Sequence, residues 1–233
     1  YRFDRLKAKE ICERVLQQTD SSEGKINAYN LLNAINSKSL QFTVEKVNVP
    51  GQSFRSLVNY KNINTLYLRI IKADEKLKEL LMNQYDEKYW PAIISATPFK
   101  HWQQQLPATN DLQEHSVEIK IDGLATGEYI LVASDKKELD GNKTIIGARF
   151  FYVSGISYVH NSNDYFVLNR DNGQPIAKAL VQVWEQKYDY KQSKYIKEKG
   201  KSYTTDANGF FILDKAKKES NNYGNYSYLI DIR

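Results

Sequence analysis

From about residue 39 onward, hydrophobic and polar residues alternate in short runs, and this period of two predicts β-strands. Two runs place three apolar residues on one face: Leu66, Leu68 and Ile70, and then Val117, Ile119 and Ile121. The run from Tyr129 to Ala133 is apolar at every position, which is typical of a strand covered on both faces. The pattern predicts a mainly β protein built from antiparallel β-sandwiches.

Residues 1–38 follow a different period. Apolar residues recur three and four positions apart in two segments: Ala8, Ile11, Cys12 and Val15, and then Ala28, Leu32 and Ile35. This spacing predicts two amphipathic helices, and the polar residues 19–22 between them supply a turn and a helix N-cap. We expect a short αα-hairpin here. Because the sequence begins at Tyr1 inside the helical pattern, we interpret the hairpin as the end of a helical region that lies upstream.

Residues 39–155 are predicted to form a first sandwich with an insertion. The apolar positions change parity between Val44 and Val47, which predicts a bulge or bend at Glu45 and Lys46. Residues 73 to about 108 do not follow the strand pattern. Glu75 to Met82 has a helical pattern, whereas Trp90-Pro91 argues against one continuous helix, so we expect at least one helix in this insertion.

Residues 156–233 are predicted to form a second sandwich. Gly155 and the polar run Asn161 to Asn163 are interpreted as its boundary. Five short strands are expected, separated by turn residues: Tyr165–Leu168, Ala179–Trp184, Tyr203–Thr205, Phe210–Leu213 and Tyr226–Ile232. The segment Asp206 to Gly209 between two of them predicts a hairpin turn.

Composition supports a folded β-rich protein and excludes several functions. The 233 residues are 41% hydrophobic and include 17 tyrosines, a residue type that is enriched in strands. The net charge of +5 comes from 33 basic and 28 acidic residues. These charges are spread along the chain and no nucleic-acid-binding motif is present, so we predict no nucleic-acid partner.

Residues that carry catalytic or metal chemistry are sparse and scattered. Cys12 is the only cysteine, so no disulfide within the chain and no thiolate metal cluster can form. His101, His115 and His160 lie in different predicted elements without metal-ligand spacing. No phosphate-binding loop, dinucleotide fingerprint or nucleophile elbow is present. We therefore predict no catalytic residue, metal or cofactor, and an enzyme is the least supported class.

The lysine-rich segment 187–201 is the best candidate for a partner surface, because basic and aromatic side chains together bind sugars, bases or anionic head groups. Its candidate residues are Tyr188, Tyr190, Lys191, Lys194, Tyr195 and Lys197. The alternative is that these lysines prevent an edge hairpin from pairing with another sheet.

Two stretches resemble the macroglobulin domains of bacterial alpha-2-macroglobulins. The first runs from Phe166 to Val181 and contains Gly173-Gln174-Pro175, and it is followed by Thr205-Asp206-Ala207-Asn208-Gly209-Phe210-Phe211. The second runs from Leu40 to Asp74, with Val49-Pro50-Gly51 and an expected strand over Asn59–Arg69, and is taken together with His115–Ser134. It resembles the first macroglobulin domain of Bacteroides-type members, which follows a helical hairpin.

This resemblance implies a function that the residues alone do not carry. Members of the family present a bait segment to proteases in the periplasm or cell envelope and trap them, some through a Cys-Glu-Gln thioester. Here Cys12 is followed by Glu13 and Arg14, so this chain holds no thioester. The implied role is a non-catalytic scaffold whose partners are further macroglobulin domains of the same chain and target proteases of the full-length protein. Membrane attachment is expected only through parts outside this sequence. The alternative is a surface adhesin or carbohydrate-binding β-sandwich protein.

Overall fold

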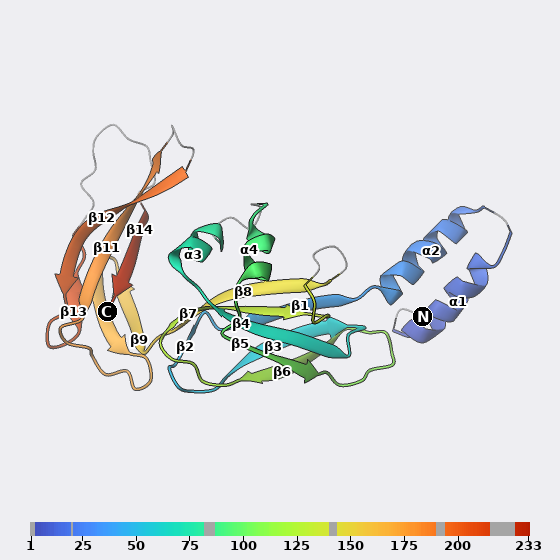
Figure 1. Ribbon diagram of the computed structural model, residues 1–233, viewed down its shortest axis with the longest axis horizontal. Helices are drawn as coiled ribbons and strands as arrows, with labels where there is room; N and C mark the ends of the chain where they lie inside the picture. The colour runs from blue at the N-terminus through green and yellow to red at the C-terminus, as the bar shows by residue number, and fades with distance from the viewer. Residues whose placement is uncertain (1–2, 20, 82–86, 140–143, 190–193, 215–226) are drawn as a thin grey trace. The chain divides into compact units, whose positions relative to one another are not determined.

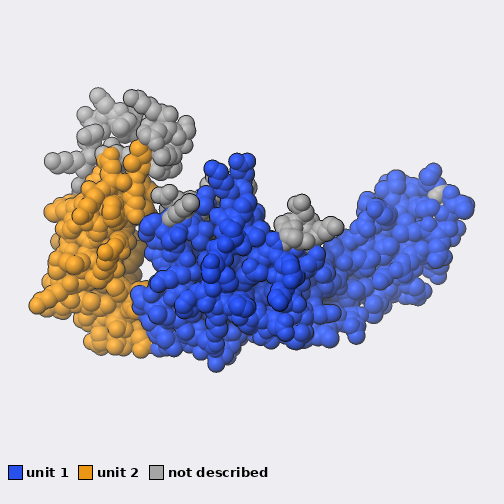
Figure 2. Space-filling view, viewed as in Figure 1, with its two compact units in different colours: residues 1–153 blue, residues 154–233 orange. Residues whose placement is uncertain are grey.

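The fold was analysed in a computed structural model of the chain (Figure 1). The structure describes residues 3–19, 21–81, 87–139, 144–189, 194–214 and 227–233. The chain divides into two compact units, Tyr1–Val153 and Ser154–Arg233, which Figure 2 shows in blue and orange. The helical hairpin is counted within the first unit, and the separate domain expected for residues 1–38 stays a prediction.

The hairpin consists of α1 (Arg5–Leu16) and α2 (Glu23–Asn36). Each helix begins at a polar N-cap: the Asp4 carboxylate accepts a hydrogen bond from the Lys7 N–H at 2.9 Å, and the Ser22 hydroxyl accepts one from the Lys25 N–H at 3.4 Å. The buried positions of the two helices are Cys12, Ala28 and Ile35. The αα-hairpin predicted from the three-and-four spacing is therefore confirmed.

The first unit contains a three-stranded and a five-stranded sheet. The three-stranded sheet has the order β1-β3-β6, with bounds Ser39–Val44, Phe54–Lys61 and His115–Ile121. The five-stranded sheet has the order β2-β8-β7-β4-β5, with bounds Val47–Asn48, Ile146–Val153, Gly127–Ser134, Thr65–Lys72 and Lys100–Gln105. All pairs are antiparallel except β2 with β8. Side chains from both sheets form one core, among them Phe42, Val58, Leu68, Leu131 and Phe151.

The predicted bend at Glu45 and Lys46 is where the chain passes from one sheet to the other. β1 pairs with β3, whereas β2 pairs with β8 in the five-stranded sheet. Asn48 is buried just after the bend, and its side-chain amide donates to the Glu45 carbonyl at 3.0 Å. The change of parity in the sequence thus marks a strand that switches sheets.

The segment Asn59–Arg69 was expected as one strand, and this is wrong. It contains the end of β3 and the start of β4, which are separated by a turn at Asn62. Asn62 has a φ of 56°, a conformation that asparagine tolerates better than most residues. An asparagine-containing turn between two apolar runs was therefore missed.

The insertion holds α3 (Glu75–Leu81) and α4 (Tyr89–Ser95), so the prediction of at least one helix is confirmed. Pro91 lies in the first turn of α4, where its missing N–H leaves no helical hydrogen bond unmade. The insertion also contributes β5, a strand that the sequence pattern did not predict.

The two insertion helices cover the outer face of the five-stranded sheet (Figure 1). Leu77 of α3 and Ile93 of α4 belong to a second buried cluster with residues of three strands: Ile71, Ile130, Val132 and Ala148. Residues 130–134 of β7 are accordingly buried at every position. This explains why the sequence is apolar without alternation at Tyr129 to Ala133.

The second unit is a smaller sandwich of two three-stranded sheets. One sheet has the order β13-β10-β9, with bounds Phe210–Ile212, Asp164–Asn169 and Ile156–Asn161. The other has the order β12-β11-β14, with bounds Lys194–Thr204, Leu180–Asp189 and Ser227–Ile232. The core between them includes Tyr165, Val167, Val181, Val183 and Phe211. The mainly β, double-sandwich fold class is thus confirmed.

Two local expectations for the second unit need correction. The polar run Asn161 to Asn163 is a tight hairpin turn between β9 and β10, with φ of 55° at Ser162, and the strand before it was missed. The Asp206 to Gly209 turn is present, and Gly209 is required there because its φ is 71° and a Cβ would lie 2.3 Å from the Val167 carbonyl oxygen. However, the strands it joins, β12 and β13, lie in different sheets and do not form a hairpin.

Candidate functional site

The predicted partner surface lies on the hairpin formed by β11 and β12. The backbone register places Tyr188 opposite Tyr195 and Asp189 opposite Lys194. Tyr190 and Lys191 fall outside the described residues, and the side chains of Tyr188, Lys194 and Tyr195 are likewise not described. Of the six candidate side chains, only that of Lys197 is placed, so a clustered surface stays a prediction.

The Lys197 side chain packs against its own sandwich. Its ammonium lies 4.5 Å from the centroid of the Trp184 ring on β11, at cation–π distance. Farther along β12, the Lys201 ammonium contacts the Asp214 carboxylate at 2.6 Å, and this hydrogen bond raises the pKa of Lys201. Since β12 is also an edge of its sheet, these lysines fit edge protection as well as they fit partner binding.

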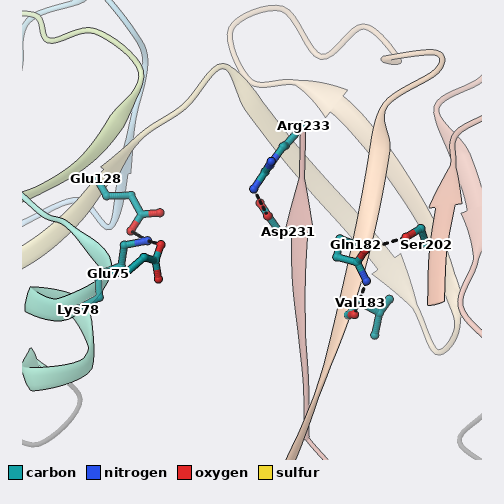
Figure 3. A network of polar contacts seen from close by, with 8 residues as sticks. All are labelled: Glu75, Lys78, Glu128, Gln182, Val183, Ser202, Asp231 and Arg233. Atoms are coloured by element: carbon teal, nitrogen blue, oxygen red, sulfur yellow. Dashed lines mark hydrogen bonds and ion pairs between the residues drawn. The ribbon is translucent and has the colours of Figure 1, made fainter. Parts of the chain in front are cut away.

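A bulge separates the base of this hairpin from its tip. The register shifts between Gln182 and Trp184, and the Gln182 amide nitrogen donates to the carbonyls of Val183 at 2.8 Å and Gly200 at 2.9 Å. The Ser202 hydroxyl donates to the Gln182 side-chain oxygen at 2.7 Å (Figure 3). The bulge interrupts the backbone hydrogen bonds between β11 and β12, and the Gln182 side chain supplies partners for the carbonyls beside it. Gln182 therefore has a structural role.

The three histidines do not converge. His101 is exposed on β5, whereas His115 contacts the Asp111 carboxylate at 2.8 Å, a hydrogen bond that lowers the pKa of Asp111. His160 stacks on Tyr165 with 4.9 Å between ring centroids. Among the described residues, no group of three or more His, Cys, Asp or Glu side chains could hold a metal ion. Within the same residues, no helix has both the length and the apolarity needed to cross a bilayer.

A surface groove lies at the outer face of the three-stranded sheet of the first unit. Its volume is about 500 Å³, and its lining includes Val44, Asn48, Leu57 and the paired side chains of Arg55 and Glu118. The Arg55 and Glu118 side chains form an ion pair at 2.5 Å, and the Glu45 side chain also lines the groove.

The helical insertion is fastened to the sheet by a charge cluster. The Lys78 ammonium of α3 contacts the carboxylates of Glu75 at 2.6 Å and Glu128 at 2.9 Å (Figure 3). Burial alone lowers the pKa of Lys78, but the two carboxylates outweigh burial and raise the pKa. Lys78 therefore stays charged and holds α3 on β7.

The helical hairpin is fastened to the first sandwich at the C-terminal end of α2. The Lys61 ammonium donates to the Ala34 carbonyl at 2.6 Å, and the Asn62 amide donates to the carbonyls of Ile35 at 2.9 Å and Ser37 at 3.0 Å. A cation at a helix C-terminus also interacts favourably with the helix dipole. The sequence analysis missed this anchor because its two parts are about 25 residues apart and belong to different periodic patterns.

Taken together, the fold and its surfaces define a class of protein: a mainly β protein with two separately cored sandwiches and a helical hairpin. The polar groups singled out above support the fold rather than converge on a ligand.

Comparison with solved structures identifies similar folds. A crystal structure of Escherichia coli alpha-2-macroglobulin spanning domains MG0-NIE-MG1 matches with a TM-score of 0.51 and 15% identity, over 82% of this chain and 63% of that one. Alpha-2-macroglobulin from Salmonella reacted with methylamine matches over 84% of this chain and 15% of that one, at 10% identity and a TM-score of 0.31 that is too low to carry a structural argument. No family model matches the sequence, and no curated protein matches it.

The first of these likenesses confirms the resemblance to bacterial alpha-2-macroglobulins at the level of the fold. At 15% identity it establishes the fold alone, and the chain spans less than two thirds of the length of the E. coli structure.

Proposed function

We propose that this chain is a non-catalytic scaffold within a bacterial alpha-2-macroglobulin-like protein that traps or inhibits proteases. The observation that carries the proposal is the fold likeness to the E. coli protein over 82% of this chain. In this role the two sandwiches are spacers with their own cores, and their partners are further macroglobulin domains of the same protein.

The contacts of the first unit support a structural role. The hairpin, the insertion helices and the sheets are joined by ion pairs and capped carbonyls: Lys61 with α2, Lys78 with Glu128, and Lys38 with Asp135 at 2.8 Å. These contacts hold the helices and the connecting segments of this unit on its sheets. Protease capture then depends on parts of the protein outside this sequence.

A protease assay on the full-length protein tests the proposal. A trap encloses the protease and excludes large substrates from it, so the protein should suppress cleavage of a large protein substrate while cleavage of a short peptide substrate continues. The matched control is the isolated 233-residue chain, which should suppress neither. Equal loss of both activities, no loss of either, or trapping by the isolated chain would contradict the proposal.

The same proposal places the protein outside the cytoplasm, in the periplasm or at the cell envelope. Fractionation of cells that make the full-length protein tests this location, and recovery in the cytoplasmic fraction would count against it. A glycan-binding screen on the 233-residue chain tests the alternative of a carbohydrate-binding surface protein. Specific binding that is lost when Lys197 is replaced by glutamate would favour that alternative.

A further inference from the structure

Strand β9 is an edge strand without the usual protection against pairing. It forms one edge of the sheet β13-β10-β9, and its sequence, Ile156-Ser157-Tyr158-Val159-His160-Asn161, contains no Lys, Arg, Asp, Glu or Pro. In natural proteins, charges, proline or bulges commonly prevent edge strands from pairing with another strand. In the same unit, the edge strand β12 follows this rule, with Lys197, Lys199 and Lys201 and a bulge. β9 has neither device.

The register shows which backbone groups of β9 point away from the sheet. Tyr158 lies opposite Val167, and the Val167 N–H donates to the Gly209 carbonyl at 2.8 Å on the other side of β10. In an antiparallel pair, bonded and non-bonded positions alternate, so Tyr158 and His160 direct their N–H and C=O groups toward the free edge. No hydrogen bond from these four groups is found among the described residues.

The side chains of this edge are exposed yet held in place. Tyr158 is 49% exposed and Val159 is 56% exposed. Tyr158 and His160 both contact the Tyr165 ring, at 5.8 Å and 4.9 Å between centroids, and Tyr165 in turn stacks on Phe211 in the core. An edge fixed in this way loses little conformational freedom when a partner binds.

We propose that β9 pairs with β9 of a second copy of this chain, in an antiparallel arrangement with Val159 on the two-fold axis. In this register Tyr158 of each copy lies opposite His160 of the other, and all four free backbone groups on each copy find a partner. Val159 lies opposite Val159 of the second copy in a non-hydrogen-bonded pair, where side chains approach most closely. The two sheets become one six-stranded sheet.

A second copy fits this edge better than a charged peptide does. The strand carries no charge that an acidic or basic segment would complement, and two identical uncharged strands meet without like-charge contacts. The paired residues are aromatic opposite aromatic and β-branched opposite β-branched, which are favourable cross-strand pairs. The inference does not depend on the proposed function, because it concerns only the second unit's own strands.

Sedimentation velocity of the 233-residue chain over a wide concentration range tests the pairing. The chain should show a reversible monomer–dimer equilibrium, and Val159→Lys should weaken it at least about tenfold by placing two ammonium groups face to face on the axis. The matched control is Leu180→Lys, which changes an equally exposed apolar residue of β11 (62% exposed). A chain that stays monomeric at every concentration, or two variants that dimerise equally, would overturn the proposal.

A cysteine variant tests the register itself. Non-hydrogen-bonded antiparallel pairs have Cα atoms about 4.5 Å apart, within the range that a disulfide spans. Under mild oxidation Val159→Cys should give disulfide-linked dimers at least about tenfold faster than Leu180→Cys, an enrichment expected from effective concentration. Cys12 is buried in the helical hairpin and serves as an internal negative control. Equal rates for the two variants would rule out the proposed register.

Discussion

The two sandwiches differ in what covers the outer faces of their sheets. In the first, α3 and α4 cover the five-stranded sheet, so β7 is buried on both faces. In the second, β10 alternates between buried Tyr165 and Val167 and exposed Asp164 and Phe166. The comparison shows that a single helical insertion turns a half-exposed sheet into a central layer. Among the described residues of the second unit no helix covers the sheet β13-β10-β9, and outward-facing side chains such as Phe166 are exposed.

The largest expected effect is in the core between the two sheets of the first unit. Phe151 is fully buried between Phe54 and Tyr129, with ring centroids 5.4 and 5.7 Å away. Phe151→Ala should lower the free energy of unfolding of the first unit by about 3–5 kcal/mol through lost burial and a cavity. Urea unfolding followed by tryptophan fluorescence measures the change. A loss below about 1 kcal/mol would mean that the two sheets do not share the core described here.

The next prediction tests whether the packing of α4 on the five-stranded sheet contributes to stability. Ile93 of α4 is 1% exposed against the outer face of the sheet, so Ile93→Ala should cost about 2–5 kcal/mol. The exposed neighbour Ser95 provides the control, and Ser95→Ala should change stability by less than about 0.5 kcal/mol. Similar values for both variants would show that the insertion is not part of the folded core.

A smaller effect is expected at the anchor of the helical hairpin. Asn62→Ala removes two hydrogen bonds to the end of α2 and replaces asparagine at a positive φ by a residue that tolerates this conformation less well, so it should cost about 1–3 kcal/mol. Asn62→Gly removes the same bonds but keeps the backbone conformation, and should cost less. Thermal unfolding by circular dichroism compares the two. An equal cost would show that the backbone conformation contributes nothing.

In the second unit an outward-facing ring provides a contrast with the core ring of Phe151. Phe166 is 41% exposed and contacts Phe210 with 5.0 Å between ring centroids. Phe166→Ala should therefore lower the free energy of unfolding only by the interaction between the two rings, about 0.5–1.5 kcal/mol. Urea unfolding of this variant beside Phe151→Ala makes the contrast direct. A cost as large as that of Phe151→Ala would mean that the outer face of β10 is covered after all.

The smallest effect concerns acid sensitivity. Burial alone raises the pKa of Asp135, but the Lys38 ammonium and the Ile145 N–H outweigh it and hold the pKa below its ordinary 3.8. A carboxylate with a lowered pKa stabilises the fold above the unfolded-state pKa, and this contribution disappears as the pH falls through the folded-state pKa. Asp135→Asn should therefore reduce the loss of stability below about pH 4, by less than about 1 kcal/mol because Lys38 is half exposed. Unfolding midpoints measured from pH 6 to pH 2.5 check this, with Asp164→Asn at an exposed position of β10 as control. An unchanged acid profile for Asp135→Asn would contradict the assignment.

Much of this fold could be predicted because its strands alternate locally. The alternation of Leu66, Leu68 and Ile70 predicts β4 from the sequence. The spacing of three and four residues within positions 1–38 likewise predicts the helices of the hairpin. β5 was missed because Trp102 is its only large apolar residue among Lys, His and Gln. β9 was missed because Asn161 to Asn163 has the composition of a linker. Such segments become strands through pairing with a neighbour, which a local pattern does not contain.

The candidate partner surface could be predicted less well than the fold. Lys197 and Trp184 meet only because of the strand register and the bulge beside Gln182, and neither is visible in residue spacing. Recognising β9 as an edge strand also requires the order of the strands in its sheet, because the edge is defined by the absence of a neighbouring strand. Composition indicated where aromatic and basic residues gather, but their contacts depend on the fold.

The central claim of this account is that each sandwich is held by its own core. The most direct test is the ¹H–¹⁵N NMR spectrum of residues 154–233 expressed alone, compared with that of the whole chain. We predict a dispersed spectrum in which the amides of β10, β11 and β13 keep their positions, because Tyr165, Val167, Val181 and Phe211 pack on one another within this unit. A collapsed spectrum typical of an unfolded chain would contradict the claim.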